Sequence, residues 1–573
     1  MSITIGINAN HADSSICIFE KNKLIFGIEE ERINRIKHWA GFPAESIELG
    51  LSSCNLNIDQ IDEVFLNTNP YSNLTKKLFY YINNFLFSKK YREILSRQKK
   101  KLNINSEFKK KFKCNKNFQI TFTDHHLSHI ASAFYPSGYK DAVGLSIDGF
   151  GDFCSMAIAI CKNHKIKIIE RVYFPDSLGV FYETLTQMIG FKNYGEEYKV
   201  MGLSSYGEPI YKDIMLDNLF HKSELFKLNL KYFNHNKINY TYNFEGSPNQ
   251  KQLFDNSLKE LIGQNNLDES IKFESQANIA SSCQKVYETQ LLKIIDKIKK
   301  LNISKNLVYA GGCALNSLAN KKLFEDKFFE NIFIPYAPGD SGGAIGSALF
   351  HLSKKYQTFQ NLQTPFIGPF FTNNEMNEII TQYNLKDYLV KFFDNEDDQI
   401  DFMSKKLMEK KVIGVFWNKM EFGARALGNR SILASPCFDD MKSIINEKIK
   451  RRESFRPFAP AVLEDKKKDW FTRSTVNPYM SNVEDIIQEK RKLIPAVTHI
   501  DGTGRVQSVN RDSNLKFYKL VKKFSEYSNV PILLNTSFNE NEPIVTKPQQ
   551  AIECFKRTKM DILALEKYLI IRK

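Results

Sequence analysis

ITIGINANHADSSICIFEKNKLIFGIEEER (residues 3–32) and AVGLSIDGFGDFCSMAIAICKNHKIKIIERVYF (residues 142–174) decide the fold, because both stretches follow one plan. Each begins with an apolar strand, passes through a polar or acidic turn, and continues as two further strands. The first stretch then runs into a charged helix. Repetition of a strand–turn–strand unit indicates an internal duplication.

Two glycine-marked units follow the second copy, at LVYAGGCALNSLANKKL (307–323) and IPYAPGDSGGAIGSALF (334–350). In each, a buried strand meets a glycine turn and then a helix. Such transitions bring backbone N–H groups and a helix N-terminus to one point, which suits phosphates and other anions. The four units in order predict a duplicated α/β nucleotide-binding fold of the actin/hexokinase (ASKHA) type.

A second α/β domain is predicted after residue 370. The stretch 352–372 has two prolines and no clear period, which is typical of a linker. A helix is predicted near 396–410 and a strand at 411–417. We therefore expect domains at 1–360 and 370–573.

Composition excludes several classes of protein. Hydrophobic residues make up 42% of the chain and charged residues 25%, which is ordinary for a globular protein. The nine cysteines never form CxxC, which argues against a disulfide framework and a thiolate zinc site. The start lacks the pattern of a secretory signal, and the apolar stretch 78–87 is too short to span a bilayer. We therefore expect a cytoplasmic protein with no membrane partner.

The net charge of +15 is concentrated in KKYREILSRQKKKLNINSEFKKKFKCNK, residues 89–116. Such a run is typical of a solvated helical face. Binding of nucleic acid is the alternative, but no series of aromatic residues for base stacking accompanies it. The sequence therefore disfavours a nucleic-acid partner.

TFTDHHLSHIASAF (121–134) holds three of the ten histidines. Its apolar spacing predicts a helix with Thr123 or Asp124 as N-cap. His125 and His129 are then one turn apart on one face, the spacing by which a helix offers two imidazoles to one metal. His126 points elsewhere, behind the ligands or toward a substrate. A capped helix with solvated histidines is the alternative.

Two carboxylates favour the metal interpretation. Asp148 ends an apolar strand in SIDGFGD, and Asp340 begins the PGDSGGAIG turn. In a duplicated α/β fold both strand ends face one crevice. Two imidazoles and two carboxylates with open positions suit Fe(II), with Mn or Zn as alternatives, better than a closed structural zinc.

The sequence resembles the carbamoyltransferase family of NodU and the aminoglycoside O-carbamoyltransferase, whose first domain is TsaD-like, shared with the enzyme of tRNA threonylcarbamoylation. The resemblance covers nearly the whole chain. The matching stretches are GINANHADSS, EEERINRIKHWAGFP, DHHLSHIASAF, EEYKVMGLSSYGEP, YAGGCALNSLAN, GDSGGAIGSAL, MEFGARALGNRSILASP, RRESFRPFAPAVL, HIDGTGRVQSV and LLNTSFNENEPIV.

The resemblance implies a two-step reaction. A YrdC-like C-terminal domain makes carbamoyl-adenylate and pyrophosphate from carbamoyl phosphate and ATP, with Mg accompanying ATP. The N-terminal domain passes the carbamoyl group to a small-molecule acceptor, a hydroxyl or amine of a sugar or natural product. The implied metal ligands are His125, His129, Asp148 and Asp340. The implied adenylate-binding residues are Gly149, Lys199, Gly311, Gly312, Asn316, Asn320, Gly342 and Gly343.

Three residues are candidates for catalysis in the N-terminal domain. His11 lies in the first turn and has the pKa class of a general base; a hydrogen-bonded turn residue is the alternative. Asp13 is the second candidate and His126 the third. An ion pair of Lys199 with Glu196 or Glu197 competes with its proposed contact to the adenylate phosphate.

Basic residues cluster in the C-terminal half, as a site for two polyanions requires. Arg451 and Arg452 suit a solvated helix face. The family pattern GRxEFGPRALG reads NKMEFGARALG here, so Asn418, Lys419 and Ala424 depart from it. The candidates for binding carbamoyl phosphate and ATP are Arg425, Arg430, Lys450, Arg456, Arg505, Ser537 and Asn539.

Two other functions stay open. One is an ASKHA-type sugar kinase or ATPase, which leaves the histidine pair and the arginine-rich second domain without a role. The other is a tRNA-modification protein that binds RNA through residues 89–116. The acceptor, the metal and the oligomeric state, a homodimer included, are not readable from the sequence.

Overall fold

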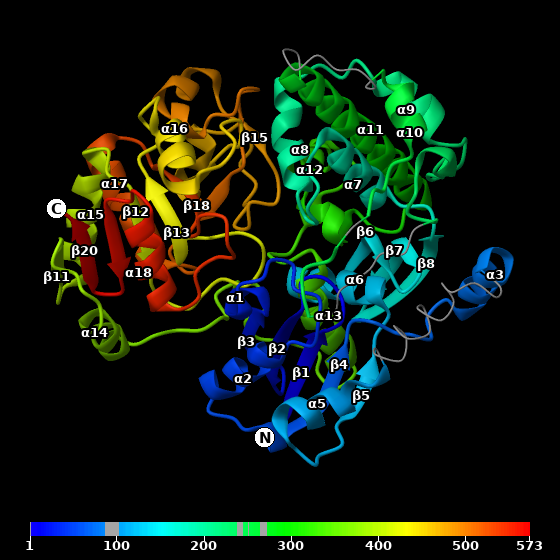
Figure 1. The fold of residues 1–573 in the computed structure, drawn as a ribbon, viewed down its shortest axis with the longest axis horizontal. Helices are drawn as coiled ribbons and strands as arrows, with labels where there is room; N and C mark the ends of the chain where they lie inside the picture. Colours follow the sequence, from blue (N-terminus) through cyan, green and yellow to red (C-terminus); the bar gives the residue numbers. More distant parts are fainter. Residues whose placement is uncertain (1, 86–101, 238–244, 250, 264–271) are drawn as a thin grey trace. The chain divides into compact units, whose positions relative to one another are not determined.

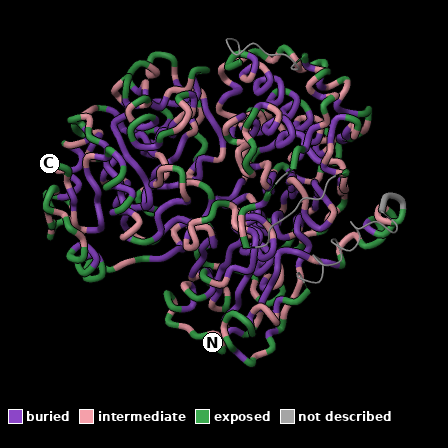
Figure 2. Tube along the Cα trace, in the orientation of Figure 1, coloured by how far each residue is buried: buried purple, intermediate pink, exposed green. Residues whose placement is uncertain are grey.

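The computed structural model describes residues 2–85, 102–237, 245–249, 251–263 and 272–573. The described chain divides into two compact units, Met1–Gln363 (unit 1) and Thr364–Lys573 (unit 2). Part of the basic run, 89–101, lies outside the described residues. Figure 1 shows the elements of both units, and Figure 2 shows that buried residues concentrate in their sheets.

Unit 1 contains two five-stranded sheets of the same design. The first has the order β3-β2-β1-β4-β5 and the second the order β8-β7-β6-β9-β10. In each, three antiparallel strands are followed by two that run parallel to the first. The strands are β1 Ile3–Asn8, β2 Ser15–Glu20, β3 Lys23–Glu29, β4 Ile61–Leu66, β5 Gln119–Phe122, β6 Asp141–Gly151, β7 Cys154–Lys162, β8 Lys165–Tyr173, β9 Asn306–Ala310 and β10 Asn331–Phe333.

Strand register confirms the duplication. Gly6 pairs with Cys17 of β2 and Phe65 of β4, while Gly144 pairs with Ala159 of β7 and Val308 of β9. Gly6 of the first half therefore corresponds to Gly144 of the second. The predicted strands of 3–32 and 142–174 are all present. Unit 1 thus has the duplicated actin-like α/β fold.

Two helices cross at the centre of unit 1. Helix α6 (His125–Ser137) follows β5, and α13 (Asp340–Leu352) follows β10. Each packs on the sheet of the other half: α13 lies on β1, β2 and β4, and α6 lies on β6, β7, β8 and β9. Asp124 is the N-cap of α6, as predicted, and its side chain accepts a hydrogen bond from the Leu127 N–H. The N-terminal turn of α6 carries the histidines, and α13 begins at Asp340.

The crossing of α6 and α13 requires a residue without a side chain. A β-carbon at Gly346 would lie 1.8 Å from the Ser128 carbonyl oxygen. We expect Gly346→Ala to lower the free energy of unfolding of unit 1 by about 1–3 kcal/mol, because the backbones must separate. Thermal unfolding checks this, with Gly149→Ala as control, since no atom lies within 4 Å of that β-carbon. An unchanged melting temperature for Gly346→Ala would contradict the close crossing.

The other helices of unit 1 cover the sheets or extend beyond them. The 30-residue α11 packs against α7, α8, α9 and α12, and α2 lies on β2 and β3. Their bounds are α1 Glu31–Asn34, α2 Ala44–Ser53, α3 Leu74–Phe85, α5 Ile104–Phe112, α7 Leu178–Ile189, α8 Glu197–Leu203, α9 Lys212–Leu219, α10 Asn256–Leu261, α11 Lys272–Leu301 and α12 Ser317–Glu325.

Unit 2 is built on an eight-stranded mixed sheet of order β11-β20-β19-β12-β13-β18-β14-β17, beside a two-stranded sheet of β15 and β16. The predicted helix and strand near 396–417 are α15 and β12. The elements are α14 Asn373–Thr381, β11 Tyr388–Phe392, α15 Glu396–Met408, β12 Ile413–Phe416, β13 Arg430–Ala434, α16 Met441–Ile445, β14 Ala459–Leu463, β15 Glu484–Asp485, β16 Thr503–Gly504, β17 Gln507–Val509, α17 Leu515–Ser528, β18 Ile532–Ser537, α18 Pro548–Arg557, β19 Ile562–Leu565 and β20 Tyr568–Arg572.

Candidate functional site

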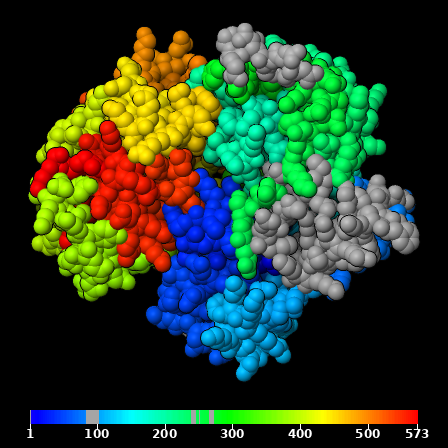
Figure 3. Space-filling model, in the orientation of Figure 1, coloured from blue at the N-terminus to red at the C-terminus, as the bar shows by residue number. Residues whose placement is uncertain are grey.

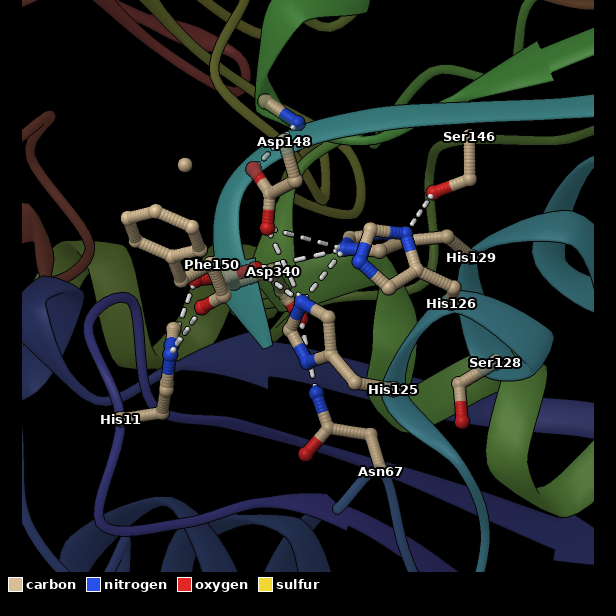
Figure 4. A network of polar contacts seen from close by, with 12 residues as sticks. His11, Asn67, His125, His126, Ser128, His129, Ser146, Asp148, Phe150 and Asp340 are labelled. Atoms are coloured by element: carbon tan, nitrogen blue, oxygen red, sulfur yellow. Dashed lines mark hydrogen bonds and ion pairs between the residues drawn. The ribbon is translucent and has the colours of Figure 1, made fainter. Parts of the chain in front are cut away.

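Four buried side chains converge where α6, β6 and α13 meet (Figure 4). His125 Nε2 lies 2.9 Å from Asp148 Oδ2, 3.0 Å from His129 Nε2 and 3.4 Å from Asp340 Oδ1. His129 Nε2 lies 3.5 Å from Asp148 Oδ2 and 3.4 Å from Asp340 Oδ1. The fold therefore brings the four predicted ligands together.

These separations fit a divalent metal ion. Ligand bonds of about 2.1 Å place neighbouring donor atoms about 3.0 Å apart in octahedral geometry and about 3.4 Å apart in tetrahedral geometry. The measured separations, 2.9–3.5 Å, span that range. Asp340 Oδ1 is buried without a hydrogen-bond partner among the described residues, and a metal ion would satisfy it. The four residues of the cluster therefore fit Fe(II), Mn or Zn, the ions that two imidazoles and two carboxylates favour.

The charges in this cluster favour ligation. Burial raises the pKa of Asp148, but hydrogen bonds from His125 and His129 outweigh it and hold that pKa well below its usual value. Burial also raises the pKa of Asp340, and the His11 charge is the main cause that lowers it below its usual value. Both carboxylates are therefore ionised at neutral pH, the form that binds a cation.

Contacts behind the cluster orient its members. The Gly312 N–H donates to Asp148 Oδ1 at 2.9 Å, so the other carboxylate oxygen of Asp148 faces the histidines. His11 Nδ1 lies 2.6 Å from Asp340 Oδ2, which leaves Oδ1 of Asp340 toward them. Such contacts orient metal ligands and tune their affinity. The Gly312 backbone therefore orients Asp148, and the His11 side chain orients Asp340.

Asp152 also supports the cluster and was not among the predicted residues. Its Oδ2 accepts from the His125 N–H at 2.9 Å and the Asn69 N–H at 2.7 Å, and its Oδ1 accepts from Thr68. A β-carbon at Gly151 would lie 1.9 Å from the His125 ring, so only glycine fits there. The signal was present in GFGD, directly after Asp148, but nothing in the sequence shows that this turn reaches α6.

The three catalytic candidates take different places. His11 pairs with Asp340, and its Nε2 lies 3.3 Å from the Phe150 carbonyl oxygen, so the geometry favours a positioning role over a free base. Asp13 pairs with His38. His126 is fully buried, with its nitrogens 2.8 Å from Ser146 Oγ and 2.9 Å from the Cys154 carbonyl oxygen (Figure 4). Of the two places expected for His126, a position toward a substrate is corrected, because both ring nitrogens have partners within the protein; the alternative, behind the ligands, agrees with these contacts.

The Asp13–His38 pair makes stability depend on pH. Burial lowers the pKa of His38, but the carboxylates of Asp13 and Glu31 outweigh it and raise the pKa to about 9. The protonated imidazole therefore stabilises the fold fully below pH 6.5, and this contribution is lost as pH rises through 9. We expect His38→Gln to reduce by about 2 °C or more the fall in melting temperature between pH 6.5 and 9.5. Equal falls in both proteins would contradict this.

The predicted adenylate-binding residues of unit 1 separate into three groups. Space is open at Gly149, but β-carbons at Gly311, Gly342 and Gly343 would meet Ile147, Ala337 and Asn67 within 2.4 Å. These three positions therefore allow close packing, Gly311 in the turn after β9 and the other two in the first turns of α13. The remaining residues have partners in the protein: Gly312 with Asp148, Asn316 with Gln284 and Ala319, Asn320 with Ala314, and Lys199 with Glu196. For Lys199 the ion pair, the competing interpretation, is the observed contact.

A group of arginines lies in the loops of unit 2. Burial lowers the pKa of Arg505 well below its usual value, and the charges of Arg425, Arg452 and Arg456 lower it further. Arg505 Nε is buried without a hydrogen-bond partner among the described residues of the chain. Burial also lowers the pKa of Arg425, to about 10. Several cations held close together favour the binding of a polyanion. Arg452, expected on a solvated face, belongs to this group.

Other basic candidates of unit 2 are parts of the scaffold. Arg430 is fully buried over the Phe416 ring, and it donates to four backbone carbonyls, those of Trp417, Asn418, Asn429 and Pro369. Its predicted role in binding phosphate is therefore corrected. Lys450 Nζ contacts carbonyl and side-chain oxygens of Ser537 and Asn539, so these three predicted residues contact one another.

Two family models match the chain. The model of the carbamoyltransferase N-terminus matches residues 3–349, and that of the carbamoyltransferase C-terminus matches residues 404–572. The chain belongs to the carbamoyltransferase family. It is therefore a transferase, as the sequence predicts.

Proteins of bacteria and archaea are similar to nearly the whole chain. An uncharacterized protein of Synechocystis is 32% identical over 100% of this chain and 97% of its own length. The nodulation protein NolNO of Sinorhizobium fredii is 31% identical over 97% of this chain and 78% of its own length. Among solved structures, HypF of T. kodakarensis matches 63% of this carbamoyltransferase and 49% of its own chain, with 14% identity and a TM-score of 0.31.

Proposed function

We propose that this carbamoyltransferase acts in two steps, with ATP and carbamoyl phosphate as substrates. Unit 2 forms carbamoyl-adenylate, and unit 1 transfers the carbamoyl group to a hydroxyl or amine of a small-molecule acceptor. The first step consumes carbamoyl phosphate, ATP and one water molecule, and it yields carbamoyl-adenylate, phosphate and pyrophosphate. The observation that carries the proposal is the convergence of His125, His129, Asp148 and Asp340 in a member of this family.

The four side chains would hold Fe(II), with Mn or Zn as alternatives. When bound, such an ion supplies a positive charge that stabilises negative charge developing on a carbamoyl or phosphate oxygen. The protein's part is to fix the donors: Gly312 holds Asp148, His11 holds Asp340, and Asp152 holds the start of α6. Gly149, where space is open, offers backbone close to Asp148 for an adenylate phosphate.

In unit 2, the arginine group is proposed as the site for carbamoyl phosphate and the ATP phosphates. Guanidinium groups bind phosphate oxygens in pairs of parallel hydrogen bonds and stay charged at neutral pH. Arg505 supports this use because it combines a buried Nε without a hydrogen-bond partner among the described residues with the charges of three other arginines acting on it. Magnesium would accompany ATP.

The acceptor is proposed to be a sugar or another natural product. Nodulation proteins are among the relatives of this chain. A kinase of the same fold class remains the second candidate, but it would leave both the four-residue cluster and the arginine group without a role. RNA modification is the third, and its suggested contact region lies partly outside the described residues.

Incubation with ATP, carbamoyl phosphate, Mg and Fe(II), without acceptor, tests the first step. We expect pyrophosphate release that requires both substrates. Release of ADP in place of pyrophosphate would favour the kinase. No pyrophosphate above background, in protein shown to be folded, would overturn the adenylate mechanism.

A further inference from the structure

The side chain of Arg171 reaches the start of the helix that carries two of the proposed metal ligands. Arg171 lies in β8, an edge strand of the second sheet. Its Nη2 lies 3.1 Å from Asp124 Oδ2, and its Nη1 donates to Asp124 Oδ1 at 3.3 Å. Two parallel contacts between a guanidinium and a carboxylate fix both position and angle. Only 17% of the Arg171 side chain and 10% of the Asp124 side chain are exposed, so solvent weakens this pair less than a surface ion pair.

The sheet directs Arg171 toward α6. Arg171 pairs with Ala157 of β7, and Ala157 packs in one core cluster with Ile130 and Ala133 of α6. Residues directly opposite on antiparallel strands lie on the same face of a sheet, so Arg171 lies on the face that α6 covers. No helix in the described part of the chain is long and apolar enough to cross a membrane, and the apolar side of α6 packs on this sheet. Figure 3 shows helix α5, which precedes α6 in the chain, on the surface of unit 1 (light blue), whereas α6 is mostly buried.

Asp124 connects Arg171 to His125. It is the N-cap of α6 and directly precedes His125 in the chain. Its Oδ1, the oxygen that accepts from Arg171, also accepts from the Leu127 N–H at 3.1 Å. Asp152 accepts the His125 N–H from another side. The first turn of α6, and with it the direction of the His125 side chain, is therefore fixed by two carboxylates, and Arg171 holds the first of them.

We propose that Arg171 is a positioning residue for the metal site: through Asp124 it keeps His125 where it can bind the ion, without being a ligand itself. This inference rests on the proposed function, because it requires that the four-residue cluster binds a metal. Removing a group that orients a metal ligand typically lowers metal affinity by about 10- to 100-fold. A ligand bond tolerates a displacement of only about 0.2 Å, so a small movement of the first turn of α6 is enough.

Loss of the guanidinium would leave the Asp124 carboxylate nearly buried and without the ion pair that Arg171 forms with it. Such a carboxylate draws in water or turns toward solvent, because an unpaired charge is costly to keep away from water. Either change weakens the hydrogen bond from the Leu127 N–H and loosens the first turn of α6. All four ligands stay in the chain, so metal binding should weaken without disappearing.

Two other roles for Arg171 are less favoured. As a binding group for an anionic substrate it would have to turn its donors toward that anion, but its guanidinium already contacts Asp124 and forms a side-chain hydrogen bond with Cys154. As a purely structural ion pair it would stabilise the fold without affecting the metal. That role predicts lower stability with unchanged metal affinity, so an experiment can separate it from positioning.

Cobalt(II) titration of the metal-free full-length protein tests the proposal, because the visible absorption of bound cobalt reports affinity and ligand geometry together. We expect Arg171→Gln to raise the dissociation constant about tenfold or more and to change the cobalt spectrum. Arg171→Lys keeps the charge but not the two parallel contacts, so its dissociation constant should lie between those of the original protein and the glutamine variant. The matched control Lys167→Gln removes one positive charge from an exposed side chain of the same strand and should bind cobalt as the original protein does.

A double-mutant cycle with Asp124→Asn shows whether the effect passes through Asp124. Asparagine keeps a cap oxygen for the Leu127 N–H but has no charge to pair with the guanidinium. In the Asp124→Asn background, Arg171→Gln should therefore raise the dissociation constant by less than about twofold. An equal increase of about tenfold in both backgrounds would overturn the route through Asp124.

An unchanged cobalt dissociation constant and spectrum in a folded Arg171→Gln variant would overturn the positioning role, and a lower melting temperature alone would then assign Arg171 to the fold. Should the glutamine variant not fold, the lysine variant provides the same test. If the original protein binds no cobalt, the metal site of the proposed function fails, and the positioning role fails with it. Cobalt binding by the original protein that neither Arg171 variant weakens would overturn the positioning role alone.

Discussion

His125→Ala should reduce carbamoyl transfer to an acceptor by about a thousandfold or more, while pyrophosphate release from ATP and carbamoyl phosphate continues. The first expectation follows because His125 Nε2 lies within 3.4 Å of donor atoms from all three other members of the cluster. Removing one of four ligands weakens metal binding and leaves the charge of the transition state unopposed. The second expectation follows because the proposed adenylate-forming residues all lie in unit 2.

His164→Ala is the matched control for this change, since His164 lies in the turn between β7 and β8, outside the cluster. Metal content after dialysis gives a readout besides activity: the His125 variant should retain less metal than the original protein and the control. Loss of both pyrophosphate release and transfer in a folded His125 variant would mean that the two steps are not divided between the units. Full transfer by that variant would remove the cluster from the mechanism.

Arg505→Ala should reduce pyrophosphate release by about a hundredfold or more, the step that His125→Ala leaves intact. The charges of Arg425, Arg452 and Arg456 act on Arg505 and lower its pKa further than burial alone does. Its buried Nε has no partner within the described chain, so a bound anion is the acceptor that would satisfy it. Loss of a charge-assisted hydrogen bond to a phosphate in a half-buried site costs about 2–3 kcal/mol, which corresponds to this decrease.

Arg451→Ala provides the control for Arg505→Ala, because Arg451 has the same charge, is 58% exposed and pairs with Glu540. Pyrophosphate release should stay within about twofold in this variant. The Arg505 variant should still transfer the carbamoyl group from carbamoyl-adenylate supplied directly. If it released pyrophosphate normally, the arginine group would not be the phosphate site.

Strand and helix patterns predicted much of unit 1. Alternation and turn residues revealed the two strand–turn–strand units, because side chains on strands alternate between two faces whatever their partners are. The 3.6-residue period of a helix likewise separated His125 and His129, four residues apart on one face, from His126. These are local properties of the chain. The exchange of α6 and α13 between the halves depends on contacts distant in sequence, such as that of Gly346 with Ser128, and no local pattern contains it.

The sequence also predicted only part of the candidate site. Residue types identified the carboxylates and imidazoles, since metals prefer those donors. Residue type did not identify partners, since Arg430 and Arg505 are both arginines near glycine and apolar positions. Arg430 donates to four backbone carbonyls, whereas the charges of other arginines act on Arg505. The role of Asp152, to accept a hydrogen bond from the His125 N–H, exists only after the turn packs on α6, so the sequence does not indicate it.

The duplicated halves of unit 1 contribute unequally to the cluster. The starts of α6 and α13 are equivalent positions, but the first carries His125 and the second Asp340. Four residues beyond the equivalent Gly6 and Gly144, the first half has Asn10 and the second has Asp148. Identical halves would carry the same residue at both helix starts and the same residue after both strands, so this arrangement of ligands requires halves that differ. Because both halves belong to one chain, each can carry different residues at equivalent positions. The helix starts therefore supply a histidine in one half and an aspartate in the other.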